Sequence, residues 1–393
     1  MQTFYIIGIS DNRNQFLSPE IRNLVSQGKV FSGGKRHHEL VHAYLPEDAV
    51  WIDITVPLDA VFCRYEEHPE IIVFASGDPL FFGFANTVMR KLPSAKIILF
   101  PTFNSLQMLA HRILLPYQEM QTLSLTGRPW DAFDSALIRG DKLIGVLTDR
   151  EKTPATIAAR MLEYGYDNYR MTVGEALGND EEESVRTFSL EEASQSAFRF
   201  PNCLILQRNK VHPRPFGIPE SEFHLLNGRN RMITKMPVRL LTLSMLTLRE
   251  KKSFWDIGFC TGSVSIEAKL QFPELKVTAF EQRPEGKELM ERNSRKFGTP
   301  GITTVMGDFL ETELGGLPAP DAVFIGGHGG KMIEILQKIK EVLLPDGVIV
   351  FNSVSEESKA LFTKGITQIN KKVTQCTRIA VDAFNPIEIM RAE

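Results

Sequence analysis

The sequence predicts an α/β protein built from two domains, in which largely parallel strands alternate with helices. Apolar runs of strand length recur along the chain and are separated by segments with helical periodicity. The 393 residues exceed what one hydrophobic core usually holds, since domains of about 150 residues are common. The segment RNKVHPRPFGIPESEF interrupts the alternation, because proline fixes φ and lacks a backbone donor. We therefore expect domains at residues 1–208 and 219–393, joined by a linker at 209–218.

Composition restricts the class of function. With 43% hydrophobic residues, 24% charged residues and a formal net charge of −3, the chain has the composition of an ordinary globular protein. General binding of nucleic acid would need a basic face, so we expect no nucleic-acid partner. The chain contains no stretch of the roughly 20 apolar residues that span a bilayer, so we also expect no membrane partner.

The N-terminus and the cysteines indicate the cellular compartment. MQTFYIIGIS has neither the charged region nor the cleavage site of a signal peptide, and its apolar run is predicted to be a buried strand. The four cysteines show no C-x-x-C spacing, which suggests neither a disulfide framework nor a zinc site; they are Cys63, Cys203, Cys260 and Cys376. We expect a cytoplasmic protein that binds no metal.

The expected strands follow from apolar runs bounded by turn residues. In the first half they are FYIIGI, AVWIDI, EIIVFAS, AKIILF, DKLIGVLT and NCLILQ. The charged segment GNDEEESVRTFSLEEAS, at 178–194, is interpreted as a surface excursion between two strands. In the second half the predicted strands are SFWDI, KVTAFE, ITTVMGD, DAVFIG and VIVFNSV, with helices between most of them.

The segment WDIGFCTGSVSIEA, at 255–268, indicates a cofactor site in the second half. A strand ends near Asp256, a loop with Gly258 and Gly262 follows, and a helix begins. A dinucleotide fold has another glycine inside such a loop so that the backbone can approach a pyrophosphate, and Cys260 occupies that position here. S-adenosylmethionine carries no phosphate, and two glycines with a free helix N-terminus suffice for it. We therefore predict that this loop binds S-adenosylmethionine.

Two acidic residues follow the loop in the order that an adenosyl group requires. Glu281 ends the next strand, about 20 residues past the loop, where its carboxylate can accept both ribose hydroxyls. Asp308 ends the following strand and can accept from the adenine amino group, while Phe309 packs on the ring. Taken singly, Asp256 can merely orient the loop, and Glu281 and Asp308 can be strand-end or turn residues. Their order along the chain favours the interpretation that Asp256, Glu281, Asp308 and Phe309 all bind the cofactor.

These motifs resemble the decarboxylating methyltransferases of cobalamin biosynthesis that act on precorrin-6B. MITKMPVR, PDAVFIGGHGG and PDGVIVFNSV add to the resemblance, which covers nearly all of residues 216–393. It implies a Rossmann-like class I methyltransferase domain that depends on S-adenosylmethionine. It also carries cofactor binding onto Thr234, Gly258, Thr261, Gly262, Glu281 and Asp308. Family members usually have glycine where Cys260 stands, a departure that concerns loop geometry and not chemistry.

Two segments of this half are candidates for the substrate side of the site. GGHGG, at 326–330, follows a strand and opens a helix, so its backbone at Gly327 can approach a bulky ligand closely. His328 can hydrogen-bond an acetate side chain of the substrate or can be a solvated loop residue. Thr234 and Lys235 precede a helix, where they close the pocket or serve as a helix cap and a surface lysine.

In the first half, IIVFASGDPLFFG at 71–83 predicts a strand, a sharp turn and the start of a helix. Gly77 permits an unusual φ, Asp78 can cap, and Pro79 suits the first helical position. With VFSGGKRHHEL, SLTGRP and GVLTDREKTPATIAARMLEYG, this segment resembles the tetrapyrrole methylases, in particular the branch that methylates precorrin-7 at carbon 5. The resemblance covers residues 1 to about 208. It implies a two-lobed domain that binds the cofactor between its lobes, at Gly77, Asp78 and Pro79.

The basic cluster Lys35, Arg36, His37 and His38 stands beside two glycines that match this family's motif. Arginine binds carboxylates bidentately and histidine adds a pH-sensitive donor, so we predict that Lys35, Arg36 and His37 bind a substrate with many carboxylates. An exposed charged loop is the alternative. The family usually has G-x-G-P-G after the first strand, where this chain reads GISDN at 8–12, and this change loosens the floor of the cleft.

Together the two resemblances imply a fused enzyme that binds a tetrapyrrole, a precorrin or cobalt-precorrin. It methylates carbons 5 and 15 and removes carbon dioxide from the ring C acetate, and relatives of both halves are usually homo-oligomers. Methyl transfer from a sulfonium is an in-line displacement that mainly needs alignment, so we assign no catalytic side chain and no metal.

Three other functions stay open from the sequence. The first is an enzyme with the carbon 15 activity alone, whose N-terminal half only binds the macrocycle; the GISDN segment supports it. The second is a nicotinamide-dependent oxidoreductase, which the glycine loop and the acidic residue support. The third is a corrinoid carrier without enzymatic activity, which would bind the macrocycle without needing the methyl donor.

Overall fold

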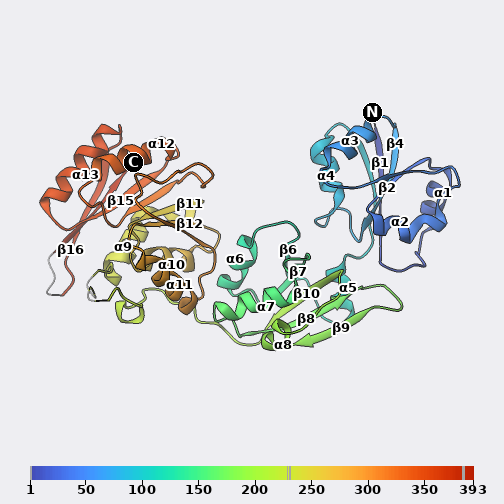
Figure 1. Ribbon diagram of the computed structural model, residues 1–393, viewed down its shortest axis with the longest axis horizontal. Coiled ribbons are helices and arrows are strands. Elements are labelled where there is room, and N and C mark those ends of the chain that lie inside the picture. The colour runs from blue at the N-terminus through green and yellow to red at the C-terminus, as the bar shows by residue number, and fades with distance from the viewer. Residues whose placement is uncertain (1, 228, 230–231, 383–385) are drawn as a thin grey trace. The chain divides into compact units, whose positions relative to one another are not determined.

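A computed structural model describes residues 2–227, 229, 232–382 and 386–393 of the chain (Figure 1). Residue contacts divide the chain into two compact units. The first unit comprises Met1–Arg128, Lys142–Ala159 and Tyr169–Asn209, and the second comprises Pro129–Asp141, Arg160–Asn168 and Lys210–Glu393. Two short segments from the first half of the chain therefore group with the C-terminal unit. Residues 209–219 contain neither a helix nor a strand.

The first sheet of the N-terminal unit is parallel throughout, in the order β3-β2-β4-β1-β5. Its strands are β1 (Thr3–Ile9), β2 (Val30–Gly33), β3 (Val50–Asp53), β4 (Glu70–Ser76) and β5 (Lys96–Phe100). The helices between them are α1 (Pro19–Gln27), α2 (Lys35–Val41), η1 (His42–Tyr44), α3 (Asp59–Glu66) and α4 (Phe84–Lys91). Phe4 and Val73 pack with residues of α3 and α4, whereas Ile7 and Phe31 pack with residues of α1 and α2. Burial on both faces explains the continuous apolar runs of these strands.

The second sheet of this unit differs from the parallel arrangement that we expect from the sequence. Its order is β6-β7-β10-β8-β9, and only β6 and β7 are parallel. Its strands are β6 (Gln121–Ser124), β7 (Leu143–Leu147), β8 (Tyr169–Glu175), β9 (Ser184–Phe188) and β10 (Asn202–Arg208). The connection between β8 and β9 is too short for a crossover helix, so these strands run antiparallel.

The segment that we interpret as a surface excursion is structured. It contains the edge strand β9 and the helix α8 (Leu190–Ser194), whose N-cap Ser189 accepts from the amide of Glu192. Charged side chains are common on edge strands, which explains why this strand resembles a loop in the sequence. The other helices of this stretch are α5 (Ser105–Arg112), α6 (Asp131–Arg139) and α7 (Pro154–Glu163).

The C-terminal unit contains a seven-stranded, Rossmann-like sheet, which confirms the predicted fold class. The strand order is β13-β12-β11-β14-β15-β17-β16; the first five strands are parallel and β17 is antiparallel to both of its neighbours. The strands are β11 (Ser253–Ile257), β12 (Lys276–Glu281), β13 (Ile302–Met306), β14 (Ala322–Ile325), β15 (Val348–Ser353), β16 (Val373–Ile379) and β17 (Ile387–Ala392).

Helices cover both faces of this sheet, as Figure 1 shows. The helices are η2 (Glu220–Glu222), α9 (Met236–Leu246), η3 (Leu248–Glu250), α10 (Ser263–Gln271), α11 (Glu285–Phe297), α12 (Met332–Val342) and α13 (Glu356–Gln368). Trp255 and Ile257 pack with α12 and α13 on one face, and Phe254 packs with α9 and α10 on the other. None of the helices in the described part of the chain has the length and hydrophobicity that crossing a lipid bilayer requires.

Candidate active site

The carboxyl ends of neighbouring strands meet at one edge of the seven-stranded sheet. Ile257 of β11 is in register with Phe280 of β12 and with Ile325 of β14, so the loops after these strands start side by side. They border a cavity of about 790 Å³. The sequence-predicted residues that line it are Thr234, Asp256, Gly258, Thr261, Glu281, Asp308, Phe309, Gly327 and His328. Gly262 is not part of this lining, because it is the N-cap residue of α10 and packs against Met290.

In the loop after β11, Cys260 adopts a backbone conformation that is usual for glycine. A Cβ atom on Gly258 would lie 2.9 Å from the amide nitrogen of Gly327, so only glycine allows the two loops to approach so closely. Cys260 has a φ of 51°, a left-handed conformation that favours glycine. Its amide donates to Oε2 of Glu281 at 2.9 Å and its thiol donates to the carbonyl oxygen of Met232 at 3.3 Å. These contacts hold the cysteine in a conformation that glycine adopts without strain.

Glu281 ends β12 as predicted, with 2% of its surface exposed. Besides the amide of Cys260, its carboxylate accepts from the amide of Arg283 at 2.9 Å and from the Arg283 guanidinium at 3.2 Å. The carboxylate therefore ties the loop after β11 to the loop after β12. The guanidinium also lies 3.3 Å from Oε2, so these contacts occupy about the four acceptor positions of a carboxylate, and ribose hydroxyls would have to displace the guanidinium.

Asp256 and Thr261 each have a buried polar atom that no described residue satisfies. Asp256 lies inside β11, one residue before its end, and its Oδ2 accepts from the hydroxyl of Ser265 at 2.6 Å. Its Oδ1 and the hydroxyl oxygen of Thr261 have no hydrogen-bond partner among the described residues. Buried polar groups are almost always hydrogen-bonded, so both atoms suit a polar ligand in the cavity.

Burial raises the pKa of Asp256 to about 7 from its ordinary value of 3.8. Between these values the folded protein retains a proton that the unfolded chain releases. The free energy of unfolding should therefore fall as pH rises through this window, by on the order of 4 kcal/mol. Asp256→Asn removes this dependence. Urea titrations of both proteins from pH 4 to pH 8 test the prediction, and parallel pH profiles would contradict it.

Asp308 and Phe309 are both engaged by other parts of the protein. Asp308 lies two residues beyond the end of β13, and its carboxylate pairs with the ammonium of Lys331 at 2.9 Å and accepts from the amide of Leu310. The hydrogen bond from Lys331, together with its positive charge and the hydrogen bond from Leu310, lowers the pKa of Asp308. The ring of Phe309 is 6% exposed and packs edge-on against Phe280, with ring centroids 5.1 Å apart. Binding of adenine by these two residues stays a prediction.

His328 lines the cavity as a neutral donor. Its Nδ1 accepts from the amide of Gly330 at 3.1 Å, and its ring packs edge-on against Phe351. Burial lowers the pKa of the imidazole, so near neutral pH the only ring proton is on Nε2. Residues that line the same cavity but are missed from the sequence include Arg283, Lys331, Asn352, Val354, Pro386 and Ile387. Asn352 has one visible signal, its position at the end of a predicted strand.

Thr234 is held near the cavity by a buried ion pair. Arg239 and Glu267, from α9 and α10, are both fully buried and lie 2.6 Å apart. The Arg239 guanidinium also donates to the carbonyl oxygens of Thr234, at 2.7 Å, and of Ile218, while Glu267 accepts from the amide of Gly217. The pair therefore joins the start of the C-terminal unit to the segment that precedes α9. Lys235 is the N-cap residue of α9.

In the N-terminal unit the turn at Gly77 packs tightly against β1. Gly77 has a φ of 63°, and its amide donates to the carbonyl oxygen of Ile9 at 2.9 Å. A Cβ atom on Gly8 would overlap the carbonyl oxygen of Gly77. The helix that we expect to start at Pro79 starts instead at Phe84. Asp78 accepts from the amide of Leu80 at 2.9 Å in a local turn.

The reason for this late helix start is visible in the turn itself. Phe82 has a φ of 54°, which is incompatible with a helix, so residues 78–83 form a loop. Asp78 is therefore not a helix cap, and Pro79 is not the first helical residue.

The basic cluster at the start of α2 contacts the end of β4. Nη2 of Arg36 and Nε2 of His37 lie 3.1 Å and 2.9 Å from the hydroxyl of Ser76. His37 Nδ1 accepts from the amide of Gly34 at 3.2 Å, so Nε2 carries the ring proton and donates to Ser76. Burial lowers the pKa of His37 to about 4. Near neutral pH His37 is therefore a neutral donor, and its binding of a substrate carboxylate stays a prediction.

Arg36 has an acidic partner that the sequence does not suggest. Its guanidinium pairs with the carboxylate of Asp11 at 3.0 Å, and Asp11 belongs to the altered GISDN segment. Asn12, the next residue, donates to Asp180, so the segment is fixed on both sides. His38 stacks on Trp51 with ring centroids 4.3 Å apart. Lys35 is the first residue of α2.

The described ranges contain no cluster of three or more His, Cys, Asp and Glu side chains placed to hold a metal ion. The predicted residues fall into two sets. One set surrounds the cavity of the C-terminal unit, and the other surrounds Gly77 and Ser76 in the N-terminal unit.

Two protein-family models match separate parts of the chain. Residues 3–194 match the tetrapyrrole (corrin/porphyrin) methylases, and residues 227–392 match the precorrin methyltransferase domain.

The chain is also similar to curated relatives and to a solved structure. A precorrin-6Y C(5,15)-methyltransferase (decarboxylating) of Sinorhizobium is 32% identical over 91% of this chain and 86% of the relative. A cobalt-precorrin-6B C(15)-methyltransferase (decarboxylating) of Salmonella typhimurium is 34% identical over 41% of this chain and 83% of the relative. The crystal structure of a precorrin-6Y C5,15-methyltransferase from Geobacter metallireducens has 33% identity, covers 47% of this chain and 99% of that chain, and gives a TM-score of 0.42.

Proposed function

This chain belongs to the family of decarboxylating precorrin-6Y C(5,15)-methyltransferases, and we propose that it methylates one precorrin at carbons 5 and 15 and removes carbon dioxide from its ring C acetate. The observation that carries the proposal is the cavity of about 790 Å³ at the carboxyl edge of the seven-stranded sheet. It lies in a chain that matches a precorrin-6Y C(5,15)-methyltransferase over 91% of its length. The reaction belongs to cobalamin biosynthesis.

We assign the two methyl transfers to the two halves of the chain. Residues 1–208 would methylate carbon 5, and residues 219–393 would methylate carbon 15 and decarboxylate, with 209–218 as the linker. The limits of the two family matches, 3–194 and 227–392, support this division. S-adenosylmethionine is the methyl donor in both halves, and it supplies an electrophilic methyl group on a sulfonium.

The cavity of the C-terminal unit fits this cofactor. The unsatisfied Oδ1 of Asp256 would accept from an ammonium group, and the hydroxyl of Thr261 would donate to a carboxylate. Glu281 would accept the ribose hydroxyls, while Asp308 and Phe309 would bind the adenine. Gly258 keeps the loop close enough to Gly327 that no side chain fills the space between them. These residues bind and align the donor, which is the main requirement of an in-line transfer.

One observation favours the single-activity alternative for the N-terminal unit. Asp11 occupies the guanidinium of Arg36, the group that we expect to bind a substrate carboxylate. A substrate carboxylate would have to displace Asp11 from this ion pair. The N-terminal unit would then bind the macrocycle weakly or only deliver it.

Mass spectrometry of the reaction product tests the proposed function. The full chain is incubated with a precorrin from the upstream enzymes and with S-adenosylmethionine that carries a deuterated methyl group. Two labelled methyl groups and the loss of one carbon dioxide are expected. One labelled methyl group with the loss of carbon dioxide would support the single-activity alternative, and an unlabelled product would contradict the proposal.

Assembly and compartment are part of the same proposal. The resemblance to both families implies a homo-oligomer, and we expect one in the cytoplasm. Light scattering on the purified chain would give its mass in solution, and the mass of a monomer would contradict the expected assembly.

A further inference from the structure

The cavity of the C-terminal unit has two chemically different ends. Glu281 and Asp308 follow β12 and β13 on one side of β11, whereas β14 and β15 lie on its other side. An adenosyl group held by the two acidic residues would therefore direct its methyl group toward β14 and β15. The lining on or near this second end includes five uncharged residues: His328, Asn352, Val354, Pro386 and Ile387. Two charged residues are nearby: Lys331, whose ammonium pairs with Asp308, and Glu357, whose charge acts on His328.

Asn352 is oriented at this end by a buried hydroxyl. Thr242, on α9, has no exposed surface, and its Oγ1 lies 3.0 Å from Oδ1 of Asn352 and 2.8 Å from the carbonyl oxygen of Val238. The hydroxyl has one hydrogen, which Thr242 shares between these two oxygens, so the amide oxygen of Asn352 faces α9 in this orientation. Its amide nitrogen is the polar atom left for a ligand, and no described residue accepts a hydrogen bond from it.

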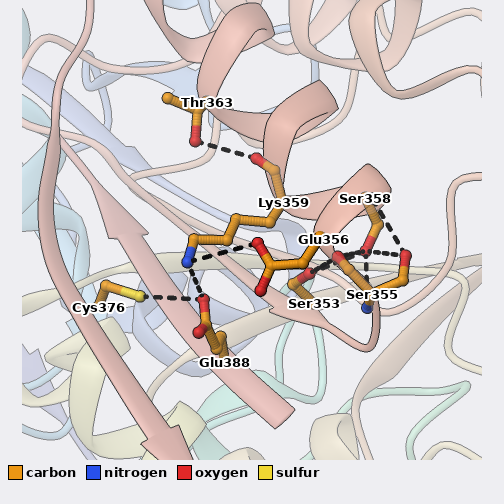
Figure 2. A network of polar contacts seen from close by, with 8 residues as sticks. All are labelled: Ser353, Ser355, Glu356, Ser358, Lys359, Thr363, Cys376 and Glu388. Carbon is orange, nitrogen blue, oxygen red and sulfur yellow. Dashed lines mark hydrogen bonds and ion pairs between the residues drawn. The ribbon is translucent and has the colours of Figure 1, made fainter.

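The backbone that follows Asn352 is fixed by a serine network, which Figure 2 shows. The buried hydroxyl of Ser353 lies 2.8 Å from the carbonyl oxygen of Ser355 and 2.8 Å from the hydroxyl of Ser358. Ser355 is the N-cap of α13 and accepts from the amide of Ser358. Asn352 is therefore held from its side chain by α9 and from its backbone by the start of α13.

His328 provides a second neutral donor from the adjacent strand. Ile325 of β14 is in register with Phe351 of β15, so the residues that follow the two strands are neighbours. The ring of His328 also packs against Phe351, and its Nε2 carries the proton. The two N–H donors of His328 and Asn352 thus belong to one end of the cavity.

We propose that Asn352 binds the acetate carboxylate that the enzyme removes, together with His328, and that Thr242 is a positioning residue for it. This inference rests on the proposed function of the C-terminal unit. Decarboxylation breaks the bond between the methylene and carboxyl carbons; the electron pair moves into the conjugated macrocycle, and the methylene then takes a proton from water. Neutral donors hold the carboxylate less strongly than a lysine or arginine would, so they orient it without opposing the loss of carbon dioxide.

Single substitutions test this proposal through the loss of carbon dioxide, measured as the ratio of decarboxylated product to product that keeps the acetate. Asn352→Ala should lower the rate of carbon dioxide loss about tenfold to hundredfold, because hydrogen bonds to charged groups have that magnitude. Asn352→Asp keeps the shape but repels a carboxylate, so its loss should be at least as large. Thr242→Val should lower the rate about threefold to tenfold, and Thr242→Ser should restore it. Affinity for S-adenosylhomocysteine should stay within twofold in every variant.

Thr363→Val is the matched control, because the hydroxyl of Thr363 makes the same helix contact, to the carbonyl oxygen of Lys359, outside the cavity (Figure 2). The ratio of decarboxylated product to product that keeps the acetate should equal that of the unchanged protein. Carbon dioxide loss by Asn352→Ala within twofold of the unchanged protein would overturn the proposal. So would a parallel loss of S-adenosylhomocysteine binding. An unchanged protein that releases no carbon dioxide would instead contradict the proposed function itself.

Discussion

Replacing Arg239 by methionine is expected to lower the free energy of unfolding of the C-terminal unit by about 3–5 kcal/mol. The guanidinium is fully buried, and its removal leaves the buried carboxylate of Glu267 without a charged partner. It also removes the donors to the carbonyl oxygens of Thr234 and Ile218. Urea titration followed by circular dichroism measures the change. The transition of the C-terminal unit is identified as the one that S-adenosylhomocysteine shifts in the unchanged protein but not in Glu281→Ala.

A surface pair gives the matched control for this substitution. Arg292 and Glu288 lie 3.6 Å apart on one face of α11, with 51% and 76% of their side chains exposed. Arg292→Met should therefore change stability by less than about 0.5 kcal/mol. The double variant Arg239→Met with Glu267→Met should recover most of the loss, since it leaves no unpaired charge. A loss below about 1 kcal/mol in Arg239→Met would contradict the interpretation.

Replacing Gly8 by alanine is expected to disable the N-terminal unit. The new methyl group would overlap the carbonyl oxygen of Gly77, so β1 and the turn at Gly77 would have to separate. Overpacking of this kind destabilises by about 3 kcal/mol and would displace the predicted cofactor residues Gly77, Asp78 and Pro79. Binding of S-adenosylhomocysteine to the N-terminal unit should fall at least about tenfold, as measured by calorimetry.

Gly315→Ala is the control for this prediction. A Cβ atom at Gly315 would meet no other atom within 4 Å, and its φ lies outside the left-handed region. Its effect on stability and binding should be below about 0.5 kcal/mol. Unchanged S-adenosylhomocysteine binding by Gly8→Ala at both units would show that the turn at Gly77 is not part of a cofactor site.

Local sequence patterns predict the fold of the C-terminal unit and the residues that we expect to bind the cofactor there. Glu281 and Gly258 are recognisable because each follows an apolar strand within a few residues, and the parallel sheet brings such strand ends together. Family membership also removes the nicotinamide and carrier alternatives that the sequence leaves open. Cys260 shows that a local rule can be broken, since its two hydrogen bonds hold the backbone that glycine would otherwise provide.

Contacts between distant residues are what the sequence does not predict. Thr242 and Asn352 are 110 positions apart, and nothing near either residue in the sequence indicates their contact. Asp11 and Arg36 form a pair only because β1 and β2 end at the same edge of the first sheet. The low pKa of His37 is not predicted by the sequence, because its burial depends on the packing of α2 against β4, which residue type does not reveal.

The number of S-adenosylhomocysteine sites per chain tests most directly whether one chain carries two methyl-transfer sites. Isothermal titration calorimetry on the unchanged protein should give two sites. Asp78→Ala should remove the site of the N-terminal unit alone, and Glu281→Ala should remove the site of the C-terminal unit alone. A single site that is lost only with Glu281→Ala would reduce the N-terminal unit to a binding module. Binding at neither unit would contradict the assignment of both as methyltransferases.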